Sequence, residues 1–310
     1  MGGGSLARQY QRRFHQGEEL QTFQKMEEFV SDETIEPVNV FGKYEVYRTA
    51  DFGYELVVDG VAVGSFAEAR VEENRILFSL SHGMLLEVSE KGTREILNPA
   101  KAMLCGLIAS DGGLHRYKRY NRKTGQYYLV HEADFDSTDK DLIEIFCRSS
   151  ENIYKKTPHL YIHEKAKGKR HEKMRAVIYD KEIFYDLYNL GAKTGPYEFH
   201  VPREHLDKEG LRAYLRGFFS GDGNLRERDH GITIRLDSTS EKGLEELRQA
   251  FIDLGFHPCE IGEYKRPRRR TVYCFFIPAK EHMRFIEEIG SDKPRHVRIF
   301  KERMKTKNEL

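Results

Sequence analysis

The chain has 310 residues and an almost balanced charge, with 51 Lys and Arg against 50 Asp and Glu. A domain usually takes about 100 to 200 residues, so this length predicts two or three domains. The absence of an apolar run of about 18 residues, a signal peptide or a transit pattern predicts an intracellular protein without a membrane span, cytoplasmic in a prokaryote or organellar, and not secreted. The four cysteines lack the CxxC spacing of zinc ribbons and show no disulfide framework.

The two parts of the chain carry opposite charge. Residues 1–97 hold 10 Lys and Arg against 17 Asp and Glu, a net charge of −7, whereas residues 98–310 hold 41 against 33, a net charge of +8. Basic charge concentrated in one part of a chain favours a polyanionic partner there. We therefore expect the later part to bind a polyanion.

The N-terminal part begins with a polar helix and continues as short strands. After the tail MGGGS, residues 6–30 place apolar side chains near helical spacing, which predicts a helix. From Val38 to Leu97 the pattern changes to short β-type runs separated by turn signals such as Asp59-Gly60. We therefore expect residues 1–97 to form an accessory region with a small, mainly β domain of antiparallel strands.

Asn98-Pro99 marks the start of the next domain, because Asn is a favoured helix N-cap and proline favours the first helical position. The apolar run that follows ends in the string LCGLIASDG at residues 104–112. A second apolar run ends in the matching string LRGFFSGDG at residues 215–223. Two such strings in one chain indicate a duplicated unit.

The segments after the two strings also match. Each string is followed by two strand-like runs, a helix, two more strands and a closing helix that ends on glycine. We expect the tripeptide DST, at 136–138 and at 237–239, to cap the middle helix of each unit. The predicted order is αββαββα, twice, in residues 98–203 and 204–310.

The two units keep their register. Asp111 and Asp222 are 111 residues apart, the two tripeptides 101, and Lys193 and Lys293 100. Ten extra residues therefore lie between the first string and the first tripeptide, in the basic segment HRYKRYNRKTGQ. A period of this size indicates duplicated domains, since a solenoid has shorter and more numerous repeats.

Small residues within the strings favour a close helix crossing. Gly106 and Ser110 stand four apart, as do Gly217 and Gly221, and this spacing lets two helix backbones approach. A crossing would bring the last aspartates of the two strings together. Two close carboxylates repel unless a cation lies between them, and their oxygens suit Mg²⁺. The alternative is that each Asp-Gly merely ends a helix, with glycine in the left-handed conformation.

The strings and the repeated order resemble the LAGLIDADG homing endonucleases, or meganucleases, in their single-chain, two-motif form. The resemblance covers residues 98–310 and implies an α+β fold of two pseudo-symmetric halves. In that family the motif helices form the interface between the halves, and each half lays a saddle of four antiparallel strands into the DNA major groove. The resemblance therefore implies double-stranded DNA as the partner, with a target of roughly 20 base pairs, and we expect a monomer.

The resemblance also implies which residues hold metal. The acidic residue at the eighth position of each motif, here Asp111 and Asp222, binds divalent metal over the scissile phosphates. The backbone carbonyls of Ser110 and Gly221 would be further ligands. Both acids are intact, which favours a nuclease over a degenerate relative. The sixth position, often acidic in the family, is Ala109 in one motif and Ser220 in the other.

The implied activity is hydrolysis of both DNA strands across the minor groove, leaving short 3′ overhangs, as in intron homing. Mg²⁺ is the implied metal, Mn²⁺ would substitute, and Ca²⁺ would support binding without cleavage. Such metals polarise the phosphate and activate water. Lys193 and Lys293 resemble the basic residues that the family places near the attacking water, although a lysine after a helix is also favoured by the helix dipole.

Other candidate residues lie near the ends of strands and in hairpins. Four polar residues are candidates for the solvent network of the centre, although helix capping explains the first of each pair equally well: Asp136 and Asp139, and Asp237 and Ser240. Basic residues of the predicted hairpins are expected to contact DNA: Arg116, Lys118, Arg119, Arg122, Lys123, Lys165, Lys167, Lys169, Arg170, Arg226, Arg228, Arg235, Lys265, Arg266, Arg268, Arg269 and Arg270.

Three further questions stay open at this point. The chain ends KTKNEL and lacks the terminal His-Asn of an intein, so we expect a free-standing protein. The N-terminal region would extend the DNA contact, bind a protein or be a remnant of a host reading frame, and its net charge disfavours a large role in DNA binding. The alternative functions are an RNA-binding intron maturase that does not cut, and a DNA-binding regulator on the same scaffold.

Overall fold

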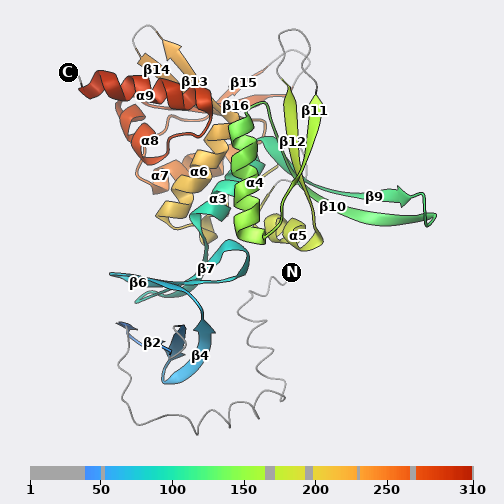
Figure 1. Cartoon of the computed structure of the whole chain (residues 1–310). Helices are drawn as coiled ribbons and strands as arrows, with labels where there is room; N and C mark the ends of the chain where they lie inside the picture. Colours follow the sequence, from blue (N-terminus) through green and yellow to red (C-terminus); the bar gives the residue numbers. More distant parts are fainter. Residues whose placement is uncertain are drawn as a thin grey trace. The chain divides into compact units, whose positions relative to one another are not determined.

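The computed structural model describes residues 39–49, 53–164, 172–192, 198–228, 231–265 and 270–308. The helix predicted at 6–30 lies outside these residues. One compact unit ends at Ala67, and a second runs from Glu68 to Leu310. Figure 1 shows the elements of both units. Among the helices described, none is long and apolar enough to cross a membrane.

Four short strands form the sheet of the first unit. They are β1 (Asn39–Phe41), β2 (Tyr44–Arg48), β3 (Tyr54–Val58) and β4 (Val61–Phe66), paired antiparallel in chain order. The predicted turn at Asp59-Gly60 is confirmed: φ is positive at both residues, as a two-residue type I′ hairpin requires. Val46 and Leu56 are paired across β2 and β3, and both are buried.

A second antiparallel sheet opens the larger unit. It consists of β5 (Ala69–Glu72), β6 (Arg75–Ser79), β7 (Met84–Ser89) and β8 (Gly92–Leu97), again in chain order. We expected one β domain over residues 1–97, but its strands are divided between the two units at Ala67. The second sheet is attached to the helices that follow: the amide of Asn98 donates to the carbonyl of Gly83, and Arg75 donates to Asp207.

The rest of the larger unit is the duplicated αββαββα pattern. The first repeat runs α3 (Pro99–Asp111), β9 (Gly112–Asn121), β10 (Gln126–Ser137), α4 (Lys140–Tyr154), β11 (His159–Glu164), β12 (Lys173–Tyr179) and α5 (Lys181–Asn189). The second runs α6 (Lys208–Asp222), β13 (Gly223–Arg228), β14 (Gly231–Ser238), α7 (Glu241–Asp253), β15 (Gly262–Tyr264), β16 (Val272–Ile277) and α8 (His282–Glu288). The fold is α+β, as predicted.

The two repeats build the same sheet. The strand orders are β11-β12-β10-β9 and β13-β14-β16-β15, which are one order read from opposite ends. Strands β9 and β10 have 10 and 12 residues, whereas β13 and β14 have 6 and 8. The extra residues of the first repeat therefore lengthen its first hairpin, which extends well beyond the helices in Figure 1.

Each sheet has one face against the helices. In β10, Ala133 and Phe135 belong to the core, so Glu132 and Asp134 face the other way, because successive strand residues alternate sides. In β14 the same alternation puts Arg235 and its neighbours two residues away opposite the core. We call the faces that carry Glu132, Asp134 and Arg235 the open faces of the two sheets.

Two expectations about helices were wrong. The middle helices are capped at Asp139 and Ser240, because Asp136 and Asp237 still belong to strands β10 and β14. Only Ser240 caps through its side chain, whose Oγ accepts a hydrogen bond from the amide of Gly243 at 3.1 Å. The closing pattern also missed a last helix, α9 (Pro294–Asn308), which packs its buried His296, Ile299 and Phe300 on the second repeat.

Candidate metal and DNA site

The two helices that end in the Asp-Gly strings start from well-formed caps. The side chain of Asn98 accepts from the amide of Lys101 at 2.8 Å, and that of Asp207 accepts from the amide of Gly210 at 2.8 Å. Every residue of α3 from Lys101 to Ser110 is buried. A helix buried on all sides is a core helix, and α3 and α6 lie side by side at the centre of the larger unit (Figure 1).

The glycines of the strings lie at the crossing of α3 and α6. A Cβ added at Gly106 would lie 2.1 Å from the carbonyl oxygen of Tyr214, and one added at Gly217 would lie 2.4 Å from that of Met103. Real Cβ atoms do not come so close to a backbone oxygen. The two helices therefore touch backbone to backbone, as their spacing of small residues predicted.

The aspartates at the ends of the strings are brought to one place. Asp111 and Asp222 are the last residues of α3 and α6, and both are exposed. A Cβ on Gly221 would lie 2.1 Å from Ser110 Oγ and 3.4 Å from Asp111 Oδ2, so the carboxylate of the first helix reaches the last turn of the second.

The glycines that follow the aspartates do not take the left-handed conformation that the alternative interpretation required. Gly112 has φ −104° and Gly223 has φ −64°, and each helix continues directly into a strand. Glycine is needed there for space: a Cβ would lie 2.5 Å from the carbonyl oxygen of Asp134 at Gly112, and 2.2 Å from that of Phe219 at Gly223. The strings are thus built for a close crossing rather than for ordinary helix ends.

Lys293 joins this group from the loop between α8 and α9. Its Nζ donates a hydrogen bond to the carbonyl oxygen of Gly221 at 3.3 Å and lies 3.7 Å from Asp139 Oδ2 of the first repeat. The residue in the corresponding place of the first repeat, Lys193, lies outside the described residues. The ends of α3 and α6 therefore gather two acids, a backbone carbonyl, a lysine and a third acid from across the interface.

The other three candidates for the solvent network have different environments. Asp136 lies 3.5 Å from Lys173 Nζ, and Asp237 accepts from Arg235 Nη2 at 2.8 Å, so both acids face cations on their open faces. Ser240 is buried in its capping role. Of the four candidates, Asp139 is the one that contacts Lys293.

The donor set at the helix ends fits a hard divalent cation. Mg²⁺ is usually held by one or two carboxylates, with water and substrate phosphate completing its shell. Asp111 and Asp222 match that number of carboxylates, and the carbonyl of Gly221 beside them accepts a hydrogen bond from Lys293. Among the residues the structure describes, no cluster of three or more His, Cys, Asp and Glu side chains could hold a metal, so an all-protein cage such as a zinc site is not formed there.

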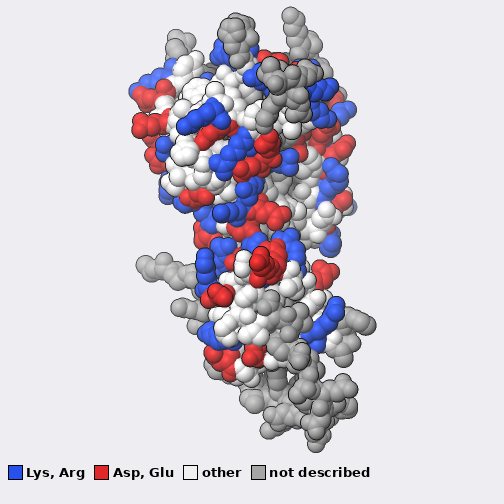
Figure 2. Space-filling view, turned by 90° about the vertical axis from the view of Figure 1, so that its left-hand side faces the viewer, with Lys and Arg blue, Asp and Glu red and all other residues white. Residues whose placement is uncertain are grey.

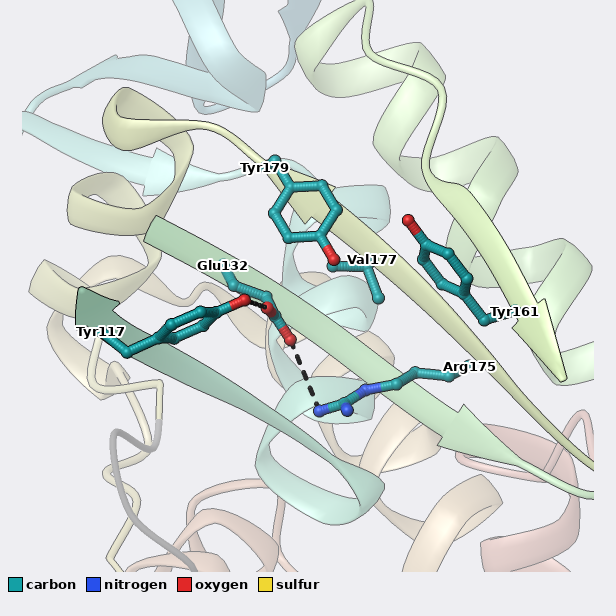
Figure 3. A pocket seen from close by; sticks show the side chains of 6 residues that line it. All are labelled: Tyr117, Glu132, Tyr161, Arg175, Val177 and Tyr179. Carbon is teal, nitrogen blue, oxygen red and sulfur yellow. Dashed lines mark hydrogen bonds and ion pairs between the residues drawn. The ribbon is translucent and has the colours of Figure 1, made fainter. Parts of the chain in front are cut away.

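A pocket of about 290 Å³ lies on the open face of the first sheet. Figure 3 shows its lining, which comprises Tyr117, Glu132, Tyr161, Arg175, Val177 and Tyr179. Glu132 accepts from the hydroxyl of Tyr117 at 2.8 Å and lies 3.5 Å from Arg175 Nη2. Burial, followed by a hydrogen bond with Tyr161, raises the pKa of Tyr179 to about 12, so its hydroxyl stays protonated.

Arg175 contacts a row of three acids on β10, of which Asp136 alone was among the predicted site residues. Besides Glu132, it contacts Asp134, and its Nε lies 3.7 Å from Asp136 Oδ1. The signal was present, because acids two residues apart on a strand share one face. A long strand with acids at every second position indicates a polar face, but their common partner is 39 or more residues away in the chain and could not be read from the pattern.

Comparison with known protein families finds a match within the second repeat. Residues 209–290 match the LAGLIDADG-like domain family. The match lies within the second repeat and covers about a quarter of the chain. One similar solved structure is that of the homing endonuclease I-DmoI in complex with DNA and Mn. It is 18% identical to this chain, the match covers 62% of this chain and 96% of that chain, and the TM-score is 0.44. Another is the N-terminal LAGLIDADG domain of DUF199/WhiA. It is 15% identical, the match covers 62% of this chain and 82% of that chain, and the TM-score is 0.42.

Curated proteins match over shorter shares of their length. The replication factor C small subunit of Methanocaldococcus jannaschii is 25% identical over 209 residues, which is 60% of this chain and 11% of that protein. The serine-protein kinase RsbW of Bacillus cereus is 30% identical over 69 residues, 22% of this chain and 42% of that protein. The chain thus spans about a tenth of the first relative and less than half of the second.

The predicted DNA-contacting residues of the two repeats take several orientations. Arg119 lies on the open face with Tyr117, whereas Arg116 points to the helices and donates to the hydroxyl of Tyr185 at 3.4 Å. Arg226 shares the open face of the second sheet with Arg235. Arg228 also lies on the open face of that sheet. Lys118, Arg122 and Lys123 are exposed on the long hairpin. Lys265 follows β15 and Arg270 precedes β16.

Seven of the predicted contacts lie outside the described residues: Lys165, Lys167, Lys169, Arg170, Arg266, Arg268 and Arg269. On the face drawn in Figure 2, basic and acidic side chains are interspersed rather than gathered in one patch. The open faces carry Arg119 on β9, Arg226 and Arg228 on β13, and Arg235 on β14.

Proposed function

We propose that the chain is a site-specific, metal-dependent endonuclease that cuts both strands of double-stranded DNA. The observation that carries this proposal is the meeting of two exposed aspartates at the ends of helices that touch backbone to backbone, with Lys293 on the carbonyl of Gly221 beside them. An ordinary pair of core helices has no need for exposed acids at a crossing. Two equivalent acids, one from each repeat, would allow one acid to act on each strand of a DNA duplex.

In this proposal Asp111 and Asp222 would hold Mg²⁺, with the carbonyls of Ser110 and Gly221 as further ligands. The metal would polarise the scissile phosphate and lower the pKa of a bound water. Lys293 would place its ammonium group near the reacting phosphate, where a positive charge stabilises the charge that develops. Asp139 fixes the direction of that ammonium group from across the interface.

The open faces of the two sheets would bind the DNA. Arg119, Arg226 and Arg228 reach outward from strands, and arginine reads guanine edges in the major groove. We propose a target of roughly 20 base pairs, about one helical turn per repeat, and a monomeric protein. Short 3′ overhangs, activity with Mn²⁺ and binding without cleavage in Ca²⁺ belong to the same proposal, and homing endonuclease I-DmoI is similarly described in complex with DNA and Mn or Ca.

A plasmid library with randomised inserts tests the proposal. The protein is incubated with the library in Mg²⁺, Mn²⁺ or Ca²⁺, and linear product is captured and sequenced. We expect linear plasmids of one sequence family in Mg²⁺ and Mn²⁺, and retained complexes without cutting in Ca²⁺. Sequence-specific binding with no cutting in any metal would instead indicate a DNA-binding regulator, and selective binding of intron RNA would indicate a maturase.

A further inference from the structure

A buried serine holds the loop that carries Lys293. Ser220 lies in the last turn of α6 and is fully buried. Its hydroxyl donates to the carbonyl oxygen of Arg216 at 2.7 Å and accepts from the backbone amide of Asp292 at 2.9 Å. One side chain thus ties the loop between α8 and α9 to the motif helix, immediately before the residues at the metal site.

The hydrogen-bond network extends from Ser220 through Ser291 to His296 of α9. Ser291 Oγ lies 3.3 Å from Ser220 Oγ and 3.0 Å from His296 Nδ1, and it accepts from the amide of Lys293 at 3.2 Å. Ser291 and His296 are both buried. Burial lowers the pKa of His296 to about 4, so its ring is neutral near pH 7 and adds no charge beside Lys293. Three buried side chains therefore fix the backbone of residues 291–293.

The first motif has no such hydroxyl. The residue that corresponds to Ser220 is Ala109, which is buried but has no polar side-chain atom. The hydrogen bonds of the Ser220 side chain therefore have no counterpart at position 109.

We propose that Ser220 is a positioning residue that acts through Lys293 and makes the two halves of the metal site unequal. The proposal rests on the endonuclease function proposed above. A lysine beside a reacting phosphate must keep its place closely, since a displacement of about 1 Å can cost on the order of a hundredfold in rate. Removal of the hydroxyl frees the amide of Asp292 and loosens the loop, so that Lys293 leaves the carbonyl of Gly221 for part of the time.

The test follows each DNA strand separately. The full chain is given a labelled duplex of its selected target, and the nicking rate of each strand is measured for wild type, Ser220→Ala, Lys293→Met and the double variant. We expect S220A to slow one strand by about tenfold and the other by less than about twofold, so that nicked duplex accumulates. We expect S220A to have no further effect when Lys293 is already methionine.

A matched control separates positioning from general loss of packing. Ser150 is also fully buried, and its hydroxyl donates to the carbonyl of Lys156 at 3.0 Å, away from the metal site. Ser150→Ala should leave the ratio of the two nicking rates unchanged. A second variant, Ser291→Ala, removes the acceptor of the Lys293 amide and should shift the same strand as S220A.

A second measurement does not depend on cleavage. Hydrogen–deuterium exchange of the amide of Asp292, which donates to Ser220 Oγ, should become at least about tenfold faster in S220A and stay unchanged in S150A, because a lost acceptor exposes its donor to water. Equal slowing of both strands, an additive effect on Lys293→Met, or unchanged exchange would each overturn the positioning role. A wild-type protein that cuts no DNA would instead overturn the endonuclease proposal, and with it the role of Ser220 in cutting.

Discussion

The carbonyl oxygen of Tyr214 lies where a side chain on Gly106 would begin. A Cβ at Gly106 would be 2.1 Å from that oxygen and 2.9 Å from the amide nitrogen of Phe218. Because the neighbours are backbone atoms of α6, they cannot move aside as a side chain could. The distance between the motif helices, and hence between the acids at their ends, is set at this point.

Gly106→Ala should therefore destabilise the larger unit by about 3 kcal/mol, since an extra methyl group in a packed core forces the helices apart. Urea unfolding measures the effect. Gly262→Ala is the control: no atom lies within 4 Å of a Cβ placed there, and we expect a change below about 0.5 kcal/mol. Equal stability of G106A and wild type would show that α3 and α6 do not cross as described.

Asp111→Asn and Asp222→Asn should each abolish double-strand cutting and leave DNA binding in Ca²⁺ within about threefold of wild type, because an amide keeps the shape of the carboxylate but loses its charge for the metal. Strand-resolved cleavage and gel-shift binding are the measurements. Glu73→Gln, an exposed acid in the turn between β5 and β6, should cut normally. Full cleavage by either aspartate variant would remove that residue from the metal site.

Stability should fall as the pH is lowered from about 6.5 to about 4. His296 has its pKa lowered by burial from 6.5 to about 4. In that window the unfolded chain binds a proton that the folded protein refuses, so the free energy of unfolding decreases by up to about 3 kcal/mol. Unfolding by urea at several pH values measures the slope.

The control for this pH dependence is a variant without the imidazole ring of His296. His296→Asn should flatten the slope between about pH 6.5 and 4, because the group that titrates is gone. Glu72 and Glu288 have pKa values lowered chiefly by hydrogen bonds from Arg75 and Arg284, so their contribution is lost at lower pH, as each carboxylate protonates. An unchanged slope in H296N would show that His296 titrates normally.

Arg75 should contribute more to stability than its neighbour Arg94, although both contact Glu87. Arg75 Nη1 lies 2.9 Å from Glu87 Oε2 and 2.8 Å from Asp207 Oδ2, and these two acids are nearly buried. Arg75→Met leaves two buried acids without that partner and should cost about 2 kcal/mol. Arg94 is half exposed, so Arg94→Met should cost less than about 1 kcal/mol. Thermal or urea unfolding that ranks R94M as the worse variant would contradict the docking of β5–β8 on α6.

The duplicated fold could be predicted from the sequence because its signals are local and occur twice. The spacing of Gly106 and Ser110 predicts a close helix crossing in a single turn of helix. Helix ends at Gly191 and Gly290 were visible as glycines, and both have positive φ. The register between the repeats then located the long first hairpin without any three-dimensional information.

Other features depend on residues far apart in the chain. Nothing near Lys101 indicates that it is fully buried, since its partner, Asp186 Oδ2 at 2.7 Å, comes from α5. Likewise, Arg75 and Asp207 are 132 residues apart. Such pairs decide which sheet belongs to which unit, and a pattern along the chain does not contain them. Helix α9 was missed for another reason. Its buried positions have helical spacing, but most of the residues around them are charged, so the segment lacked a clear apolar pattern.

The crossing of the two motif helices also requires two different residues at equivalent positions of the repeats. Ser110 fills the space that Gly221 leaves empty, with Ser110 Cβ only 2.7 Å from where a Cβ on Gly221 would be. A first repeat paired with its own copy would set serine against serine and clash, and a second repeat paired with its own copy would leave a gap. The two strings are therefore complementary at this position, and a symmetric pair of either repeat would need a different residue there.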